Sequence, residues 1–390
     1  MEKWIECKIS DIGTVVGGAT PSTKKPENYE NGDIAWITPK DLSSFSGRYI
    51  QRGERNITEI GLKSCSTQLL PKNTVLFSSR APIGYVAIAE NAVCTNQGFK
   101  SVIPNEDTDP IFLYYLLKYN KDKIESMGSG TTFKEVSRNT MKNIVVSVPQ
   151  DKQVQEKIAS VLDAIDEKIE ENERINNNLE QQAKALYKNW FFDFSTFSSD
   201  GNLPDGWRLG TVGDIIQLHD SKRVPLSGAE RDKMAKVYPY YGAASRMDYV
   251  DSYLFDGIYL LLGEDGTVVD SLGFPILQYV YGQFWVNNHA HIITGKEGFS
   301  VEELYLLFSL TNIKSIVTGA VQQKVSQQNL KKVPAIIPGK EALDAFDEII
   351  QPVFTQIRNL RDENANLAIL RDTLLPKLMS GELDVSDINL

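Results

Sequence analysis

The sequence predicts an α+β protein in which two mixed strand-and-helix domains, related by internal duplication, are separated by two long helices that pair as an antiparallel coiled coil. Three observations predict this architecture: a length of 390 residues, a repeat at an interval of about 190 residues, and two acidic stretches with heptad spacing of apolar residues. The predicted order is a first domain at 1–150, a helix at 151–200, a second domain at 201–338 and a helix at 339–390.

The duplication is clearest at the end of each domain, where residues 130–149 (GTTFKEVSRNTMKNIVVSVP) align without gaps on residues 319–338 (GAVQQKVSQQNLKKVPAIIP). Trp4 and Trp207 stand at equivalent places near the start of each copy. The interiors diverge, since the offset between the copies changes within them. Similar ends around different interiors indicate one scaffold directed at two different targets.

Inside each domain, short runs rich in β-branched and aromatic residues, bounded by Gly and Pro, predict strands. An apolar segment of about three turns predicts one helix in each copy. The predicted strands include residues 73–79, 85–89, 258–262 and 277–286, and the predicted helices are residues 110–120 and 301–312.

In each acidic stretch, apolar residues recur at alternating steps of four and three, which predicts a coiled-coil seam. The alternative is an ordinary amphipathic helix on a globular core. Asn176 and Asn364 occupy equivalent seam positions, where a buried Asn fixes register, and Pro352 is expected to delay or kink the second helix. The seam and partner-binding residues that we predict are Ile165, Ile169, Asn176, Leu179, Leu186, Trp190, Val353, Ile357, Leu360, Asn364, Leu367 and Leu374.

The composition, 42% hydrophobic and 24% charged, is that of a globular protein. Three cysteines are too few for a disulfide scaffold. No apolar run is long enough to span a membrane, and the first residues do not resemble a secretory signal. We therefore expect a cytoplasmic protein that does not contact a membrane.

A formal net charge of −10 argues at first against a nucleic-acid partner. The excess acid is concentrated in the predicted helices, because residues 151–200 hold 6 basic and 11 acidic residues and residues 339–390 hold 5 and 10. The two domains are close to neutral together, so either can still carry a local basic face.

Catalytic signatures are absent from the sequence. It contains no phosphate-binding G-x-x-x-x-G-K-[ST] loop, no G-x-S-x-G, no H-E-x-x-H and no Pro-Pro pair of the kind found in amino-methyltransferases. His289 and His291 form an H-x-H without a nearby third ligand, which favours a structural role over a metal site. We expect a non-catalytic chain with no metal and no cofactor of its own.

Several strings resemble the specificity subunits of type I restriction-modification systems, and the resemblance covers essentially the whole chain. Residues 17–44, 76–104 and 128–149 look like the opening, middle and end of a target recognition domain of that family. LEQQAKALYKNWFFDF (179–194) and LLPKLMSGEL (374–383) are the most specific strings and resemble its central and C-terminal conserved regions. The GGATPS and WITPKDL elements have no clear counterpart in the second domain.

The resemblance implies that each domain reads one half of an asymmetric, bipartite site in double-stranded DNA, with the helices as a spacer. It implies two modification subunits docked on the helices, which use S-adenosylmethionine to methylate adenine. Two restriction subunits, where present, would use ATP and Mg.

Arg, Lys, hydroxyl and amide side chains suit contacts to bases and phosphates. The predicted DNA-binding residues lie in the stretch after WITP, in the aligned loops and at single basic positions elsewhere in each domain, and for each of them the alternative is a solvated surface residue. They are Lys40, Ser43, Ser44, Arg48, Arg80, Lys100, Thr131, Thr132 and Lys134 in the first domain, and Lys222, Arg223, Arg246, Gln322, Gln323 and Lys324 in the second.

Two other functions remain open from the sequence. One is a stand-alone DNA-binding regulator on the same scaffold, which would need DNA affinity without partners. The other is a protein-interaction scaffold that uses the heptads and no DNA, which the overall acidity slightly favours. A salt titration of DNA binding distinguishes the scaffold from the other two, and co-purification with a modification subunit distinguishes the specificity subunit from the regulator.

Overall fold

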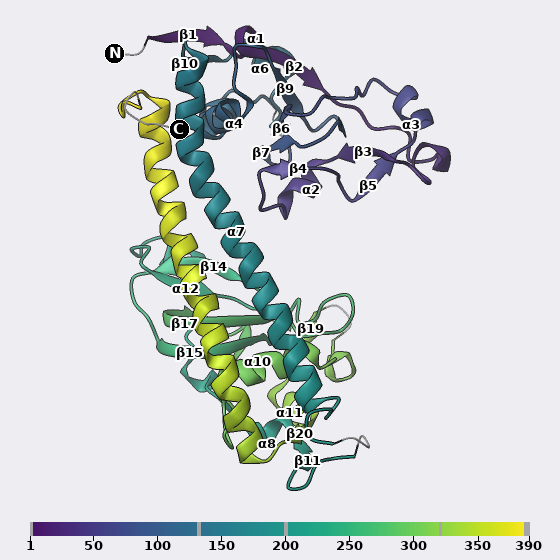
Figure 1. Cartoon of the computed structure of the whole chain (residues 1–390), viewed down its shortest axis with the longest axis vertical. Helices are drawn as coiled ribbons and strands as arrows, with labels where there is room; N and C mark the ends of the chain where they lie inside the picture. The colour runs from purple at the N-terminus through teal and green to yellow at the C-terminus, as the bar shows by residue number, and fades with distance from the viewer. Residues whose placement is uncertain (1–2, 131–133, 199–201, 320–321, 386–390) are drawn as a thin grey trace. The chain divides into compact units, whose positions relative to one another are not determined.

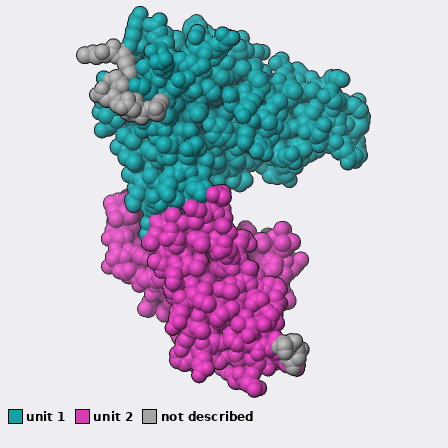
Figure 2. All heavy atoms as spheres, in the orientation of Figure 1, with its two compact units in different colours: residues 1–172, 362–390 teal, residues 173–361 magenta. Residues whose placement is uncertain are grey.

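The protein is described here by a computed structural model that covers residues 3–130, 134–198, 202–319 and 322–385. The chain divides into two compact units, unit 1 (residues 1–172 and 362–390) and unit 2 (residues 173–361), as Figure 2 shows. Each unit holds a sheet-containing domain and one half of each of two 40-residue helices, α7 (Lys152–Phe191) and α12 (Lys340–Met379). The unit boundaries therefore fall inside these helices.

Unit 1 is built on a five-stranded sheet of order β2-β9-β6-β7-β4, in which β4 runs parallel to β7 and the other neighbours are antiparallel. A three-stranded sheet (β5-β3-β8) and a ribbon (β1-β10) accompany it. The strands are β1 (Trp4–Lys8), β2 (Gly13–Gly17), β3 (Ile34–Ile37), β4 (Tyr49–Ile50), β5 (Arg55–Ile57), β6 (Val75–Ser79), β7 (Ile83–Ala89), β8 (Cys94–Thr95), β9 (Lys100–Pro104) and β10 (Val145–Pro149).

Helix α4 (Pro110–Tyr119) lies at the centre of the core of unit 1. It starts with Pro110 at its first position, and the Asp109 side chain caps it by accepting from Phe112 N. Its buried residues pack against α7 and α12 in one apolar cluster. The remaining helices are α1 (Ile9–Ile12), η1 (Pro26–Asn28), α2 (Pro39–Ser43), α3 (Glu59–Lys63), α5 (Lys121–Ser126) and α6 (Arg138–Asn143).

Unit 2 repeats this plan in a six-stranded sheet of order β12-β18-β15-β17-β13-β14, in which β13 runs parallel to β17 as β4 does to β7. A ribbon of β11 and β20 again joins the two ends of the domain. The strands are β11 (Arg208–Thr211), β12 (Ile216–Leu218), β13 (Tyr238–Tyr241), β14 (Arg246–Val250), β15 (Phe255–Gly263), β16 (Asp265–Gly266), β17 (Leu277–Val286), β18 (Ala290–Gly295), β19 (Gln323–Lys324) and β20 (Pro334–Ile337).

The duplication is also seen in single residues that cap short helices. Ser137 and Ser326, which the sequence alignment pairs, cap α6 and α11 (Gln327–Lys331) by accepting from Thr140 N and Asn329 N. The other helices of unit 2 are α8 (Val212–Ile215), η2 (Asp220–Lys222), α9 (Gly228–Arg231), α10 (Val301–Leu310) and η3 (Lys314–Ile316). The predicted α+β class, the strands and the helices at 110–120 and 301–312 are confirmed.

Helices α7 and α12 lie side by side and antiparallel within each unit (Figure 1). In unit 1, Arg371 Nη1 lies 2.7 Å from Asp166 Oδ1, and Asn172 Nδ2 donates to Asn364 Oδ1 at 2.8 Å. In unit 2, Arg361 Nη2 lies 2.8 Å from Glu180 Oε1. The predicted antiparallel pairing is confirmed, although the ends of each apolar stripe pack into the domain cores, as the alternative interpretation expected.

Two details of the helices differ from expectation. Helix α12 begins at Lys340 and continues through Pro352, so this proline does not delay it. Asn364 pairs with Asn172, whereas Asn176 is buried with its Oδ1 unpaired. The duplication places Leu360 at the position equivalent to Asn172, and leucine offers Asn176 no polar group.

Glu303 gives unit 2 a testable pH dependence. It forms the capping box of α10 by accepting from Ser300 N at 2.7 Å, while its Oε1 is buried without a partner. Burial raises the pKa of Glu303 to about 8. The folded state then holds a proton that the unfolded state loses above its ordinary pKa of about 4.3, so stability falls as pH rises through about 8.

We expect the free energy of unfolding of unit 2 to fall by about 2 kcal/mol between pH 6 and pH 8 through this group. Glu303→Gln cannot ionise and should remove that part of the slope. Urea unfolding of both proteins across this range measures it, and equal slopes would show that Glu303 is ionised throughout.

Candidate nucleic-acid interface

Three of the predicted cations of unit 1 line one cavity of about 500 Å³. Lys40 comes from α2, Arg80 directly follows β6, and Lys134 precedes α6. Thr38 and Asp41 form the capping box that starts α2, and Pro39 occupies its first position, so the local sequence sets where Lys40 emerges. The structure therefore brings together residues that lie far apart in sequence, as a binding surface for an anion requires.

Within this cluster the side chains are held by acidic neighbours. Lys40 Nζ lies 2.7 Å from Glu54 Oε2, and this hydrogen bond and charge raise the pKa of the exposed Lys40. Arg80 Nη1 lies 3.7 Å from Glu135 Oε2. Exposed pairs of this kind contribute little to stability, so these cations can exchange partners for phosphate at small cost.

Arg48 is a correction to the predicted DNA-binding set. Its side chain is only 4% exposed, and its Nε donates to Glu170 Oε1 at 2.9 Å while its Nη1 bonds to Asp163 Oδ1. Burial lowers the pKa of Arg48, but Glu170 more than offsets this and raises it above its ordinary value. The guanidinium therefore joins the domain to α7 and has no free face for DNA.

Lys100 is also placed inside the protein. Its Nζ donates to Ser79 Oγ at 3.2 Å, Glu135 Oε1 at 3.1 Å and Gln97 O at 3.4 Å, and its side chain is 11% exposed. These three bonds use all the N–H donors of an ammonium group. Lys100 therefore acts on the protein itself rather than on DNA.

The remaining predicted residues of unit 1 are hydroxyl side chains. Ser43 and Ser44 are exposed at the end of α2, where Ser43 Oγ donates to Lys40 O at 2.6 Å. Both side chains are therefore accessible to a ligand. Thr131 and Thr132 lie outside the described residues.

In unit 2 the predicted residues are less concentrated. Gln322, Gln323 and Lys324 are exposed on or beside β19, which pairs with β16. Lys222 is exposed at the end of η2, just beyond β12, whereas Arg246 is exposed on β14 at the opposite edge of the six-stranded sheet and stacks on Tyr249. Arg223 is mostly buried and lies 2.6 Å from Glu264 Oε2, which leaves it a structural role.

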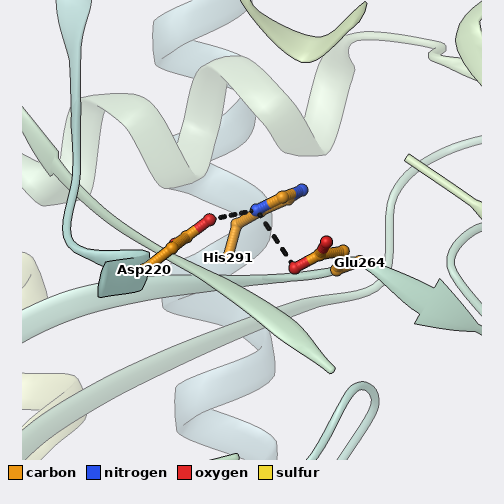
Figure 3. Close-up of side chains that lie close together, drawn as sticks. All are labelled: Asp220, Glu264 and His291. Atoms are coloured by element: carbon orange, nitrogen blue, oxygen red, sulfur yellow. Dashed lines mark hydrogen bonds and ion pairs between the residues drawn. The ribbon is translucent and has the colours of Figure 1, made fainter. Parts of the chain in front are cut away.

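A buried polar cluster in unit 2 was missed by the sequence analysis. His291 of β18, Asp220 of η2 and Glu264 lie together (Figure 3), with His291 Nδ1 2.6 Å from Asp220 Oδ2 and 3.7 Å from Glu264 Oε2. Histidine and carboxylates can hold a divalent cation. Here, however, Arg223 and Lys324 already neutralise Glu264, and a metal would have to displace them. We therefore assign the cluster to holding the fold.

Hydrogen bonds fix the orientation of His291 in this cluster. His291 Nε2 lies 2.8 Å from Val325 O, which can only accept, so Nε2 carries a proton. Burial raises the pKa of Asp220, but bonds from His291 and Ile292 N outweigh it and leave the pKa below its ordinary value. His291 Nδ1 lies 2.6 Å from Asp220 Oδ2, so hydrogen bonds hold both ring nitrogens in place. No local sequence signal reveals this pair, since the two residues stand 71 positions apart.

The predicted partner-binding residues mostly face the helix pair. Of these, Asn176, Ile357 and Leu360 are buried, and the remaining nine are half-buried. The apolar residues that α12 exposes were not predicted from the sequence, because they lie outside the heptad stripe. These are Ile349, Ile369 and Leu370.

Comparisons with known proteins agree with this organisation. A family model described as the type I restriction modification DNA specificity domain matches the chain twice, at residues 1–181 and 204–367. The type I restriction enzyme MjaIX specificity subunit of Methanocaldococcus jannaschii is 35% identical over 99% of this chain and 94% of its own length. The EcoprrI specificity subunit of Escherichia coli is 23% identical over 92% and 90%.

The crystal structure of the type I restriction-modification system S subunit from M. genitalium has the same fold, with a TM-score of 0.56 and 18% identity over 97% of this chain and 96% of that one. The two family matches cover both sheet-containing domains and most of both long helices, which confirms the duplication expected from the sequence. The chain therefore belongs to the family of type I restriction-modification DNA specificity subunits.

Proposed function

We propose that this chain gives a type I restriction-modification complex its DNA sequence specificity, with each unit reading one half of an asymmetric, bipartite site. The observation that carries the proposal is that the two units share one fold but differ in the side chains of the equivalent loop. At the aligned loop, unit 1 presents Lys134 and unit 2 presents Gln322 and Gln323. Lysine can contact guanine or phosphate, whereas glutamine can pair with adenine, so the same frame can select different bases.

In this proposal the chain acts in the cytoplasm and contributes no catalytic group. Two modification subunits supply S-adenosylmethionine-dependent adenine methylation, and restriction subunits, where present, supply ATP- and Mg-dependent activity. In the described part of the chain, no helix is long and apolar enough to cross a membrane. The domain limits of 1–150 and 201–338 remain a proposal for the segments that can be exchanged between specificities.

Helices α7 and α12 are the proposed docking elements for the modification subunits. Their outer faces are acidic, which disfavours contact with DNA phosphates and leaves them to protein partners. Ile349, Ile369 and Leu370 add exposed apolar area on α12, and Ile369 is 66% exposed. Apolar groups surrounded by charged ones suit an interface core with a polar rim.

A salt titration of DNA binding by the purified complex with a modification subunit tests the proposal. Phosphate contacts make the logarithm of the affinity fall linearly with the logarithm of salt concentration, with a slope of about −0.9 per contact. The double variant Lys40→Ala, Lys134→Ala should weaken binding and reduce the slope by about 2. Lys63→Ala, which removes an exposed cation of α3 paired with Glu59, is the matched control. A complex without salt-dependent affinity would contradict the proposal.

A further inference from the structure

The two units hold their aligned loops by the same backbone bonds. These bonds show that Ser79 and Glu264 occupy equivalent positions in the two units, as do Glu135 and Lys324. Lys100 and His291 are also equivalent, because each stands two residues after the carbonyl that accepts the first bond. The equivalent bonds are Ser79 N to Gly98 O (2.7 Å) and Val136 N to Ser79 O (3.0 Å) in unit 1, Glu264 N to His289 O (2.8 Å) and Val325 N to Glu264 O (2.8 Å) in unit 2, and the antiparallel bridges Ser129–Glu135 and Thr318–Lys324.

In unit 1 the cation of this junction comes from the sheet and the anion from the loop. Lys100 begins β9, and its Nζ lies 3.1 Å from Oε1 of Glu135. Arg80, at the end of β6, approaches the other oxygen of the same carboxylate at 3.7 Å. Glu135 directly precedes Val136, whose amide bonds to the sheet, so the ion pair and the backbone bond secure adjacent residues.

In unit 2 the loop residue of this junction carries the opposite charge, and its partner occupies the position equivalent to Ser79 rather than to Lys100. The sheet side now carries the anion Glu264, and the loop carries the cation Lys324, whose Nζ lies 3.5 Å from Glu264 Oε1. Arg223 Nη1 holds the other oxygen, Glu264 Oε2, at 2.6 Å and also donates to Ala290 O at 2.7 Å. The backbone bonds at the junction are therefore the same in both units, whereas the loop residue of the ion pair is an anion in unit 1 and a cation in unit 2.

The anchored residue stands next to the predicted DNA-contacting residue in both units. Glu135 follows Lys134, which lines the cavity with Lys40 and Arg80, and Lys324 follows Gln323. A base-reading side chain must be held within a fraction of an ångström of its productive position, by neighbours that are themselves fixed. Buried or partly buried ion pairs can fix such a register even where they add little stability.

Resting on the proposed function, we propose that Lys100 and Glu135 in unit 1, and Glu264 and Lys324 in unit 2, are positioning residues for DNA sequence recognition. Each pair sets the register of its loop by holding the backbone next to the base-reading side chain, and Lys324, which the sequence predicted to bind DNA, is assigned to this positioning role instead. Because the loop residues are opposite in charge, a loop from one unit would meet a like charge in the other: Lys324 would face Lys100, and Glu135 would face Glu264. The loops are therefore exchangeable only together with their partners on the sheet.

The test is the methylation motif written by the complex of the full chain with its modification subunit, read by long-read sequencing of host DNA. Lys100→Met and Glu135→Gln should each relax discrimination at one or more positions by tenfold or more, in one half of the motif only. Glu135→Lys should have the same or a larger effect. The double variant Lys100→Glu, Glu135→Lys restores an ion pair and should recover the wild-type motif.

Two readouts distinguish positioning from a general structural role. The unchanged half of the motif serves as an internal control for folding and assembly, and Lys63→Met, at an exposed pair in the same unit, should leave both halves intact. An unchanged motif in both single variants would overturn the inference, and so would an equal loss in both halves accompanied by a lower Tm. If the wild-type complex writes no motif that depends on this chain, the proposed function itself fails.

Discussion

Replacing Arg48 by methionine should lower the free energy of unfolding of unit 1 by about 3 kcal/mol, because removing one partner of a buried ion pair typically costs 3–5 kcal/mol. The substitution leaves Asp163 and Glu170 of α7 without the guanidinium that both contact. These carboxylates are partly exposed and regain water, so the loss should fall at the lower end of that range. Urea unfolding of the full chain, followed by hydrogen exchange of the amides of α4, measures the effect.

Arg52→Met is the matched control, since Arg52 is exposed in the same segment and should change stability by less than about 0.5 kcal/mol. The same variants test the correction made for Arg48. If Arg48→Met keeps wild-type stability while the salt slope of DNA binding falls by about 1, then Arg48 binds phosphate and its assignment to the helix contact is wrong.

Phe346→Ala should destabilise unit 2 by about 3–5 kcal/mol, as expected for a large ring removed from a packed core. Phe346 is fully buried on α12, and its ring centroid lies 5.4 Å from that of Tyr187 and 5.0 Å from that of Phe191 on α7. Trp190 completes the cluster at 5.3 Å. The substitution would therefore leave a cavity where the two helices and the domain core meet.

Thermal and urea unfolding of the full chain measure this loss, with Ile349→Ala as the control one turn away. Ile349 is 44% exposed, so its truncation should cost well under 1 kcal/mol. A loss below 1 kcal/mol for Phe346→Ala would mean that the helices do not depend on this cluster for their pairing in unit 2.

The features predicted well from the sequence are those encoded by local periodicity. The alternating steps of four and three predicted both long helices, and the aligned segments 130–149 and 319–338 adopt the same capped helix and strand. The cavity residues Lys40, Arg80 and Lys134 were predicted individually, because basic side chains suit contacts to bases and phosphates. Their convergence depends on the sheet order, which no local pattern contains.

The errors concern residues whose partners lie far away in sequence. Arg48 was assigned to DNA because it lies in the stretch after WITP and its side chain suits base and phosphate contacts, yet it bonds to residues 115 and 122 positions later. His291 was assigned a structural role without a partner, because Asp220 stands 71 positions away. The ion pair of Glu264 and Lys324 has no sequence signal, because Glu264 lies outside the aligned segments and only backbone bonds place it at the position equivalent to Ser79.

The methylome of a methylation-free host that expresses this chain with its modification subunit tests the central claim most directly. The account predicts adenine methylation at a bipartite motif with a fixed gap, which disappears when this chain is omitted. Exchanging residues 1–150 for those of another specificity subunit should change one half of the motif and leave the other half intact. Methylation that is absent, or unchanged without this chain, while both proteins are soluble and associated, would contradict the account.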